Sequence, residues 1–331
     1  MKRKKHLHSY IHYVYLFFNN SSIYSLGHVG LLTDFMASLG ELKPELETTI
    51  VVVFIANEEN ATFLGIGVDQ LAKEGYMDEL KNGPLFWIDS ADSHPCIGTA
   101  GNIQWKLDVT GKLFHSGLPH RGINSIELGM DAISTIQNKF YAQYPRTENE
   151  DKYNCTTCST MKPCQIKCTP GALNQLPPKT TIEGDIRLAP FYDIHEVKKK
   201  IEGWVNEINE NPSKIETHGP HSHYILDGDM SGKLELTWLT SGENGVACNL
   251  DSLGYKAIMY ATKKILGETK PYSIGGSLPL IRDLQDGGFD VMIAGYGSST
   301  KYHADNESAS LTDFKRATKI IANIVFSMNE K

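Results

Sequence analysis

The chain has 331 residues, of which 40% are hydrophobic, 21% charged and 9% aromatic. This composition is typical of a globular protein with enough apolar material for two domains, and it excludes collagen-like and wholly disordered chains. Lys and Arg number 32 against 39 Asp and Glu, which gives a formal net charge of -7 at pH 7. Because the basic stripe of nucleic-acid-binding proteins is absent from the sequence, we expect no nucleic-acid partner.

The N-terminal residues combine a basic start, Met1 to Lys5, with a short aromatic and apolar run from Tyr10 to Phe18. No stretch reaches the roughly 18 to 20 consecutive apolar residues of a membrane helix, so we expect no membrane partner. The run also lacks the small-residue cleavage pattern of a secretory signal peptide. With only six cysteines in the chain, the sequence favours a cytoplasmic protein, with the plastid as the alternative.

The first part of the chain alternates helix and strand signals. Apolar residues at helical spacing predict a helix over 27–40, and residues 64–73 read as another. The β-branched run from Thr48 to Ala56 and the apolar run from Pro84 to Ile88 predict strands that are buried on both faces. Helices and buried strands in this order predict an open α/β layer structure.

From Gly101 the strands alternate apolar and polar residues, which indicates one face in contact with water. The predicted elements are a strand at 103–109, a helix at 126–140, strands at 160–168 and 180–188, a helix at 194–208 and a strand at 234–238. This order is the split βαββαβ, ferredoxin-like unit.

Helix and strand patterns of the first kind resume after Asn249, with helices over 252–266, 280–285 and 312–328 and a strand over 290–297. We therefore predict a discontinuous α/β domain that is interrupted by a smaller α+β domain. The predicted α/β domain comprises residues 26–102 and 244–331, the inserted domain residues 103–243, and residues 1–25 form an atypical N-terminal segment.

Three polar clusters follow predicted buried strands: residues 57–60 (NEEN), 89–92 (DSAD) and 302–307 (YHADNE). In open α/β sheets, ligands bind beyond the carboxyl ends of the strands. Oxygen ligands and an imidazole at that edge are typical of a zinc-type site with a carboxylate left for proton transfer. Any one cluster alone more often caps a helix or stays solvated, but three at one edge favour a site.

The chain is similar to a known enzyme family in its most distinctive segments. These are LGHVGLLTDFMASLGELKPELETTIVVVFIANEEN, GPLFWIDSADSHPCIGTAG, VTGKLFHSGLPHRGIN, STMKP, GDIRLAPFYD, ACNLDS, KPYSIGGSLPLIRDLQDGGFDV and YHADNE. With them the chain resembles the aminoacylase/acetylornithine deacetylase family of dinuclear metal amidohydrolases, most closely the plant-type acetylornithine deacetylases. The resemblance implies a metallopeptidase-like α/β catalytic domain, and a ferredoxin-like insertion that serves as the lid and dimerisation domain of a homodimer.

The resemblance also implies a reaction and its central residues. The substrate would be an N-acyl amino acid, with N-acetylornithine and water giving ornithine and acetate in arginine biosynthesis. Glu58 matches the general base, which takes a proton from water and passes it to the leaving amine. Glu59, Asp89 and His303 match ligands of two metal ions per subunit, Zn²⁺ or Co²⁺.

Further matches concern the lid and the substrate pocket. His115 matches the lid histidine that reaches the partner subunit's active site, although a turn histidine is the alternative. Asn174 and Arg187 match lid positions that orient substrate, and an arginine fork suits a free α-carboxylate; a surface role on a strand is equally open for Arg187. Gly275 and Gly276 match the loop that lines the substrate pocket.

Two departures open alternative interpretations. The family carries an upstream HxD motif and an aspartate that bridges both metals, whereas this sequence has Tyr24 at the bridging position and neither the motif nor its strand upstream. The chain would then be a truncated, catalytically impaired member that retains the dimerisation lid and exposes a hydrophobic sheet edge at residues 48–56. A third interpretation is a structural metal site built from Cys155, Cys158, Cys164 and Cys168.

Overall fold

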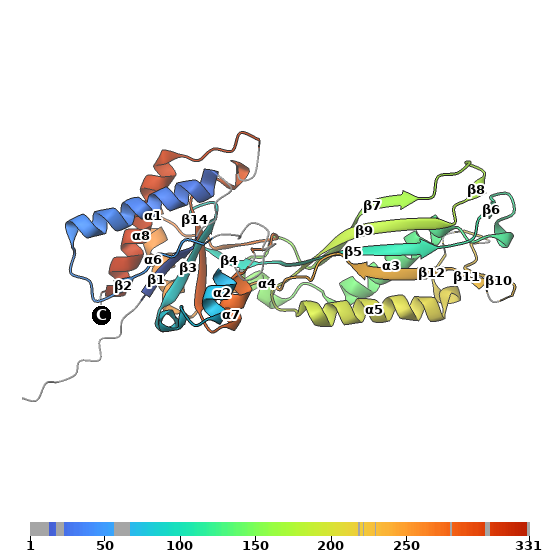
Figure 1. Cartoon of the computed structure of the whole chain (residues 1–331), viewed down its shortest axis with the longest axis horizontal. Helices are drawn as coiled ribbons and strands as arrows, with labels where there is room; N and C mark the ends of the chain where they lie inside the picture. Colours follow the sequence, from blue (N-terminus) through green and yellow to red (C-terminus); the bar gives the residue numbers. More distant parts are fainter. Residues whose placement is uncertain are drawn as a thin grey trace, which may run out of the picture.

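Two lobes lie end to end along the longest axis of the molecule (Figure 1), and their hydrophobic cores are separate. The structure is a computed structural model that describes residues 13–17, 23–55, 67–217, 219–220, 222–228, 230–278, 280–301 and 305–329. The core of the first lobe draws on residues from 31 to 96 and from 246 to 328, and the core of the inserted lobe on residues from 103 to 234. The chain therefore leaves the first lobe and later returns to it.

The first lobe is built on a six-stranded sheet with the order β13-β4-β14-β3-β1-β2. The strands are β1 (Tyr13–Phe17), β2 (Thr49–Ile50), β3 (Pro84–Ser90), β4 (Cys96–Thr99), β13 (Tyr272–Ile274) and β14 (Asp290–Gly295). β3 pairs in parallel with β1 and β14, and all seven of its residues are buried. The predicted buried strand after residue 83 is thus confirmed, because a central parallel strand is covered by helices on both faces.

Helices cover both faces of this sheet. They are α1 (Ile23–Leu42), α2 (Val68–Lys73), α6 (Leu253–Leu266), α7 (Ile281–Asp286) and α8 (Leu311–Asn329). Figure 1 shows α1, α6 and α8 on one side and α2 and α7 on the other. Within the first group α8 contacts α1 and α6, and within the second α2 contacts α7. Ser252 caps α6 by accepting the N–H of Tyr255, and Gly267 ends the helix in a left-handed conformation. The α/β layer prediction is confirmed.

The run from Thr48 to Ala56 is the main error of the sequence analysis. Its strand, β2, spans two residues, and residues 51–55 are not in a strand; Phe54 is 52% exposed. The place beside β3 belongs to β1, an upstream strand that the sequence did not predict. β2 therefore lies at the sheet edge, where it has one neighbour in place of two and is only partly covered.

The inserted lobe is a four-stranded antiparallel sheet with the order β12-β5-β9-β7. Its strands are β5 (Gly101–Thr110), β7 (Thr160–Cys168), β9 (Lys179–Leu188) and β12 (Lys233–Trp238), and its long helices are α3 (Ser125–Gln143) and α5 (Ile194–Glu210). Ile103, Trp105, Leu107 and Val109 alternate into the core beneath the helices. The predicted ferredoxin-like unit is confirmed.

Smaller elements decorate the inserted lobe. They are α4 (Glu148–Lys152), the pair β6 (Phe114–His115) and β8 (Gln175–Leu176), and the hairpin β10 (Ile225–Leu226) and β11 (Met230–Ser231). Figure 1 shows β6 and β8 at the end of the molecule that is farthest from the first lobe. Across the part of the chain that the structure describes, no helix has the length and apolar character that crossing a membrane requires.

Candidate functional site

The carboxyl ends of β3 and β14 meet at one edge of the first sheet, the place where open α/β folds bind ligands. Asp89 lies at this end of β3 and is 5% exposed. Asp92 follows in a left-handed conformation, and its Oδ1 accepts the backbone N–H of Ser299 at 2.9 Å. Asp92 thus joins the loop after β3 to the loop after β14, while Asp89 occupies the buried position at the edge.

Asp89 is the only expected metal ligand within the described residues. Glu58, Glu59 and His303 lie outside them. A buried carboxylate at a strand end is an oxygen donor suited to a divalent cation, so Asp89 fits the expected role. Among the residues that the structure describes, no group of three His, Cys, Asp or Glu side chains is placed to hold a metal ion.

That finding contradicts the structural metal site at the cysteines, since all four belong to the described residues. Cys158, Cys164 and Cys168 are exposed, and all six cysteines of the chain are free. The register of β7 shifts between Pro163 and Gln165, so Cys164 is the extra residue of a bulge. Four cysteines close in sequence are therefore not gathered around a common point.

A small hollow with a cavity volume of about 20 Å³ lies at the junction of the lobes and is lined by Arg187, Gly275 and the residues of the 155–158 loop. Arg187 ends the polar face of β9, and its Nε donates to Asp185 Oδ2 at 2.7 Å. The carbonyl of Gly276 accepts the N–H of Ala100 at 2.9 Å. The structure therefore brings the predicted arginine and glycine loop together.

His115 and Asn174 meet at the far tip of the inserted lobe. His115 Nδ1 accepts the N–H of Gly117 at 3.0 Å, and Nε2 lies 3.4 Å from Asn174 Nδ2. Since Nδ1 is an acceptor, the neutral ring carries its proton on Nε2. A backbone hydrogen bond also joins the two segments, because the N–H of Ser116, next to His115, donates to the carbonyl of Asn174 at 2.9 Å.

The tip is remote from the junction. β5 runs the length of the lobe with ten residues, from Gly101 to Thr110; at roughly 3.3 Å per residue this spans about 30 Å. Within one chain, the structure therefore separates His115 and Asn174 from Asp89, Arg187 and Gly275.

Asn102 is a candidate functional residue that the sequence did not predict. It is the β5 partner of Arg187 in the sheet register, and its side chain donates to Ser277 Oγ at 2.6 Å. The sequence feature that could have indicated Asn102 is its position as the first polar residue of an alternating strand, directly after Gly101. Nothing local indicates a partner 175 residues away.

Comparisons with known proteins agree with this architecture. The peptidase dimerisation domain family of M20 enzymes matches residues 97–212. The acetylornithine deacetylase of Arabidopsis thaliana is 49% identical over 306 residues, which cover 92% of this chain and 69% of the relative. That of Dictyostelium discoideum is 46% identical over 305 residues, covering 91% and 68%.

Solved structures are similar at the level of the fold. A tripeptidase from Staphylococcus aureus has a TM-score of 0.68 at 15% identity, covering 97% of this chain and 82% of its own. Human carnosine dipeptidase 1 has a TM-score of 0.65 at 14% identity, with coverage of 97% and 81%.

Proposed function

The chain belongs to the acetylornithine deacetylase family, and on this basis we propose that it hydrolyses the amide of N-acetylornithine to give ornithine and acetate, a step of arginine biosynthesis. The observation that carries the proposal is the 49% identity to the Arabidopsis thaliana relative over 92% of the chain. This identity does not favour the interpretation of a catalytically impaired relative.

We propose that the enzyme uses two divalent ions, zinc or cobalt, and that Asp89, Glu59 and His303 contribute ligands. The burial of Asp89 at the carboxyl end of β3 supports its part in this set. When bound, such ions polarise an amide carbonyl and lower the pKa of water toward about 7. Glu58 would take the proton of the attacking water and return it to the leaving amine.

In this proposal the substrate binds at the junction of the lobes. The planar guanidinium of Arg187 would bind the free α-carboxylate of the substrate through paired hydrogen bonds. The hollow that Arg187 shares with Gly275 supports this assignment. Gly275 and Gly276 are exposed, and without side chains they leave backbone N–H groups open to a ligand.

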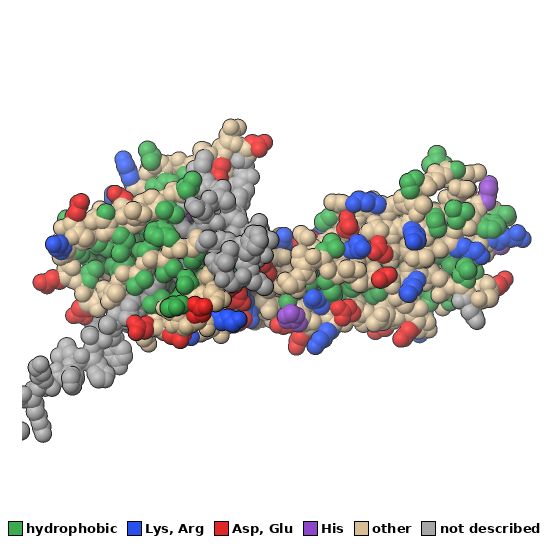
Figure 2. All heavy atoms as spheres, in the orientation of Figure 1, with side chains coloured by type: hydrophobic (Ala, Val, Ile, Leu, Met, Phe, Trp, Pro, Cys, Tyr) green, Lys and Arg blue, Asp and Glu red, His purple; other side chains and the backbone are tan. Residues whose placement is uncertain are grey.

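A homodimer would complete the site. We propose that His115 of one subunit, oriented by the N–H that Gly117 donates to its Nδ1, donates its Nε2–H to the oxyanion that develops in the partner's active site, and that Asn174 beside it helps to orient the substrate. The position of this pair at the tip and the match to a dimerisation domain support the proposal. Figure 2 shows hydrophobic side chains at this end of the molecule, and Leu173 beside Asn174 is fully exposed, as expected of a surface that a partner covers.

We further propose a reducing compartment, either the cytoplasm or the plastid. All six thiols are free in the structure. Cys96 and Cys248 are both buried, and burial raises the pKa of the Cys96 thiol to about 12. Such thiols stay protonated and unreactive, in keeping with a chain that does not depend on disulfides.

The test is a deacetylase assay on the purified full chain supplied with Zn²⁺ or Co²⁺, in which ornithine release from N-acetylornithine is quantified. We expect activity that a chelator removes and either metal restores. Asp89→Asn should abolish turnover and lower the bound metal measured by elemental analysis. Asp92→Asn is the matched control, because it keeps an acceptor for the Ser299 N–H. A folded, metal-loaded protein that releases no ornithine would refute the proposal.

A further inference from the structure

The lobes are connected by the outgoing strand β5 and by a returning segment, residues 239–247, and the two contact each other backbone to backbone. Asn102 and Glu243 exchange both of their N–H···O bonds at 2.9 Å, and Thr99 N–H donates to the carbonyl of Val246 at 2.9 Å. A Cβ on Gly101 would lie 2.6 Å from the Glu243 carbonyl oxygen, closer than any real Cβ contact. The connection therefore needs glycine here to keep the two segments in register.

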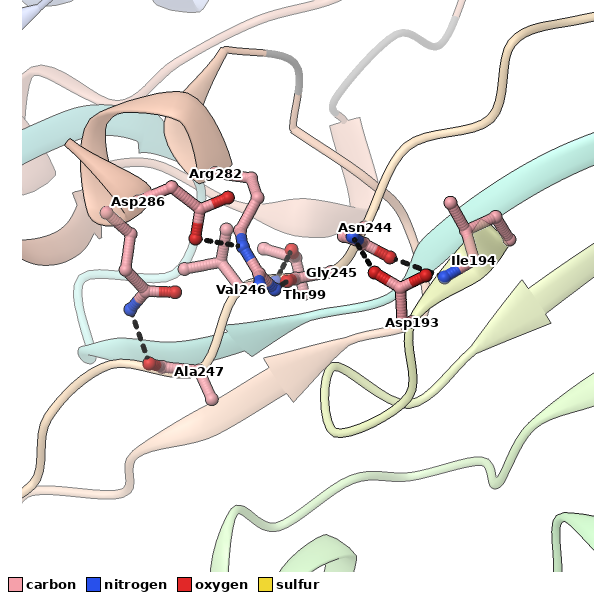
Figure 3. A network of polar contacts seen from close by, with 10 residues as sticks. Thr99, Asp193, Ile194, Asn244, Gly245, Val246, Ala247, Arg282 and Asp286 are labelled. Atoms are coloured by element: carbon pink, nitrogen blue, oxygen red, sulfur yellow. Dashed lines mark hydrogen bonds and ion pairs between the residues drawn. The ribbon is translucent and has the colours of Figure 1, made fainter. Parts of the chain in front are cut away.

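The returning segment is hydrogen-bonded to both lobes at adjacent residues (Figure 3). Asn244 Oδ1 accepts the N–H of Ile194, at the start of α5 in the inserted lobe, at 2.8 Å. The carbonyl of the next residue, Gly245, accepts from Arg282 Nη1 on α7 of the first lobe at 3.0 Å. Neighbouring residues of this segment are thus bonded to different lobes.

The outgoing strand holds the glycine loop. Ala100 N–H donates to the carbonyls of Ile274 at 3.1 Å and Gly276 at 2.9 Å, so the backbone secures the start of the loop. Asn102 Nδ2 secures its end by donating to Ser277 Oγ at 2.6 Å, and Glu243 Oε2 lies 3.3 Å from the same amide nitrogen. These bonds hold the adjacent residues Gly276 and Ser277. Gly275 and Gly276 are exposed, and glycine has the greatest backbone freedom of any residue, so the loop needs such bonds to keep one conformation.

Asn102 therefore stands between the loop and the arginine. Its side chain reaches Ser277, and its backbone is paired with Arg187 on the neighbouring strand. We propose that Asn102 is a positioning residue: through Ser277 it holds the Gly275–Gly276–Ser277 loop at a fixed place relative to Arg187, so that both contact the substrate together. This inference rests on the proposed function, because it assigns the loop and Arg187 to the substrate pocket.

The test compares Asn102→Ala and Ser277→Ala with Gln104→Ala, which removes an exposed side chain two residues along the same strand face. Hydrogen exchange of residues 274–278, followed by mass spectrometry, should be faster in the first two variants and unchanged in the control. KM for N-acetylornithine should rise about fivefold with kcat within about twofold, as expected for the loss of one net hydrogen bond before the chemical step. The double variant should show no larger effect than either single one, because both changes remove the same bond.

Unchanged loop exchange, or faster exchange with an unchanged KM, would overturn the proposal, as would additive effects in the double variant. If Asn102→Ala does not fold, Ser277→Ala carries the test, because Ser277 is half-exposed in a loop. If the wild-type chain does not release ornithine, the proposed function fails and the substrate role of Asn102 fails with it. The exchange measurement still decides, independently of activity, whether Asn102 holds the loop.

Discussion

Mixing two inactive variants should restore activity if the tip of one subunit serves the site of its partner. The pair is His115→Ala, at the exposed tip of the inserted lobe, and Asp89→Asn, at the buried end of β3 in the first lobe. β5 alone spans ten residues, or about 30 Å at the usual rise of a strand. No side chain can cover that distance, so within one chain His115 cannot touch a substrate held beside Asp89.

The recovered activity follows from counting sites. Random pairing of equal amounts gives heterodimers in half of the molecules. In a heterodimer, one site combines the intact Asp89 of the first variant with the intact His115 of the second, and the other site lacks both. One site in four is then complete, so the mixture should recover about a quarter of the wild-type rate per subunit if each site of a dimer acts independently of the other.

The assay is ornithine release after the two variants are co-expressed or are refolded together, with each variant refolded alone as the control. Size-exclusion chromatography with light scattering establishes that dimers form. Arg187→Ala mixed with Asp89→Asn is the matched negative pair, because both residues serve the same subunit's site and no heterodimer site is complete. A His115→Ala and Asp89→Asn mixture no more active than its separate components would refute the reasoning.

Two further predictions concern a buried histidine and the substrate clamp. Burial lowers the pKa of His28 to about 4, while its Nε2 accepts the N–H of Tyr296 at 3.0 Å. In the unfolded chain the histidine has its ordinary pKa of about 6.5, so between pH 7 and pH 4 the unfolded chain binds more protons than the folded one. The free energy of unfolding should therefore fall by about 3 kcal/mol as pH drops from 7 to 4. Urea unfolding should show this difference against His28→Gln, which keeps an acceptor but does not titrate, and equal slopes would contradict it. Arg187→Lys keeps the charge but loses the fork, so KM should rise about tenfold. A substrate methyl ester should not discriminate between the two proteins, and a similar loss with the ester would assign Arg187 another role.

Local patterns were sufficient to predict the elements that bury a continuous face. The alternation of Ile103, Trp105, Leu107 and Val109 identified β5, and helical spacing identified α5, which Asp193 caps in the structure. In both cases the apolar residues recur with the period of the element, so the buried face can be predicted without knowing which other elements pack against it. The short strands β4 and β13 were missed because they are four and three residues long and exist through their pairing with each other.

The run from Thr48 to Ala56 illustrates the opposite limit. β-branched composition indicates that a segment can form a strand, but it does not say how many neighbours the strand will have. β1 occupies the inner place, and β2 is left at the edge with two residues in the ladder. Sheet order is a property of the whole fold, so composition alone could not distinguish these positions.

Some features of the candidate site could likewise be predicted from the sequence, and others could not. Asp89 could be located from sequence because a carboxylate directly after a buried strand must lie at the carboxyl edge of the sheet. The separation of His115 from Arg187 could not, since both belong to one predicted domain and only the length of β5 sets them apart. The bond between Asn102 and Ser277 joins residues 175 positions apart, and neither has a local pattern that indicates the other.

The junction links the architecture to the chemistry. Because Gly101 lets the connecting segments contact directly, Ala100 and Asn102 lie close enough to the first lobe to bond the loop that begins at Gly275. β5 continues into the inserted lobe, where it pairs with β9. Arg187 is the second-last residue of β9. β5 thus contacts both sides of the hollow, whereas His115 at the tip is proposed to act in the site of the second subunit. Substrate binding should therefore be a property of each chain, and only the step that needs His115 should require the dimer.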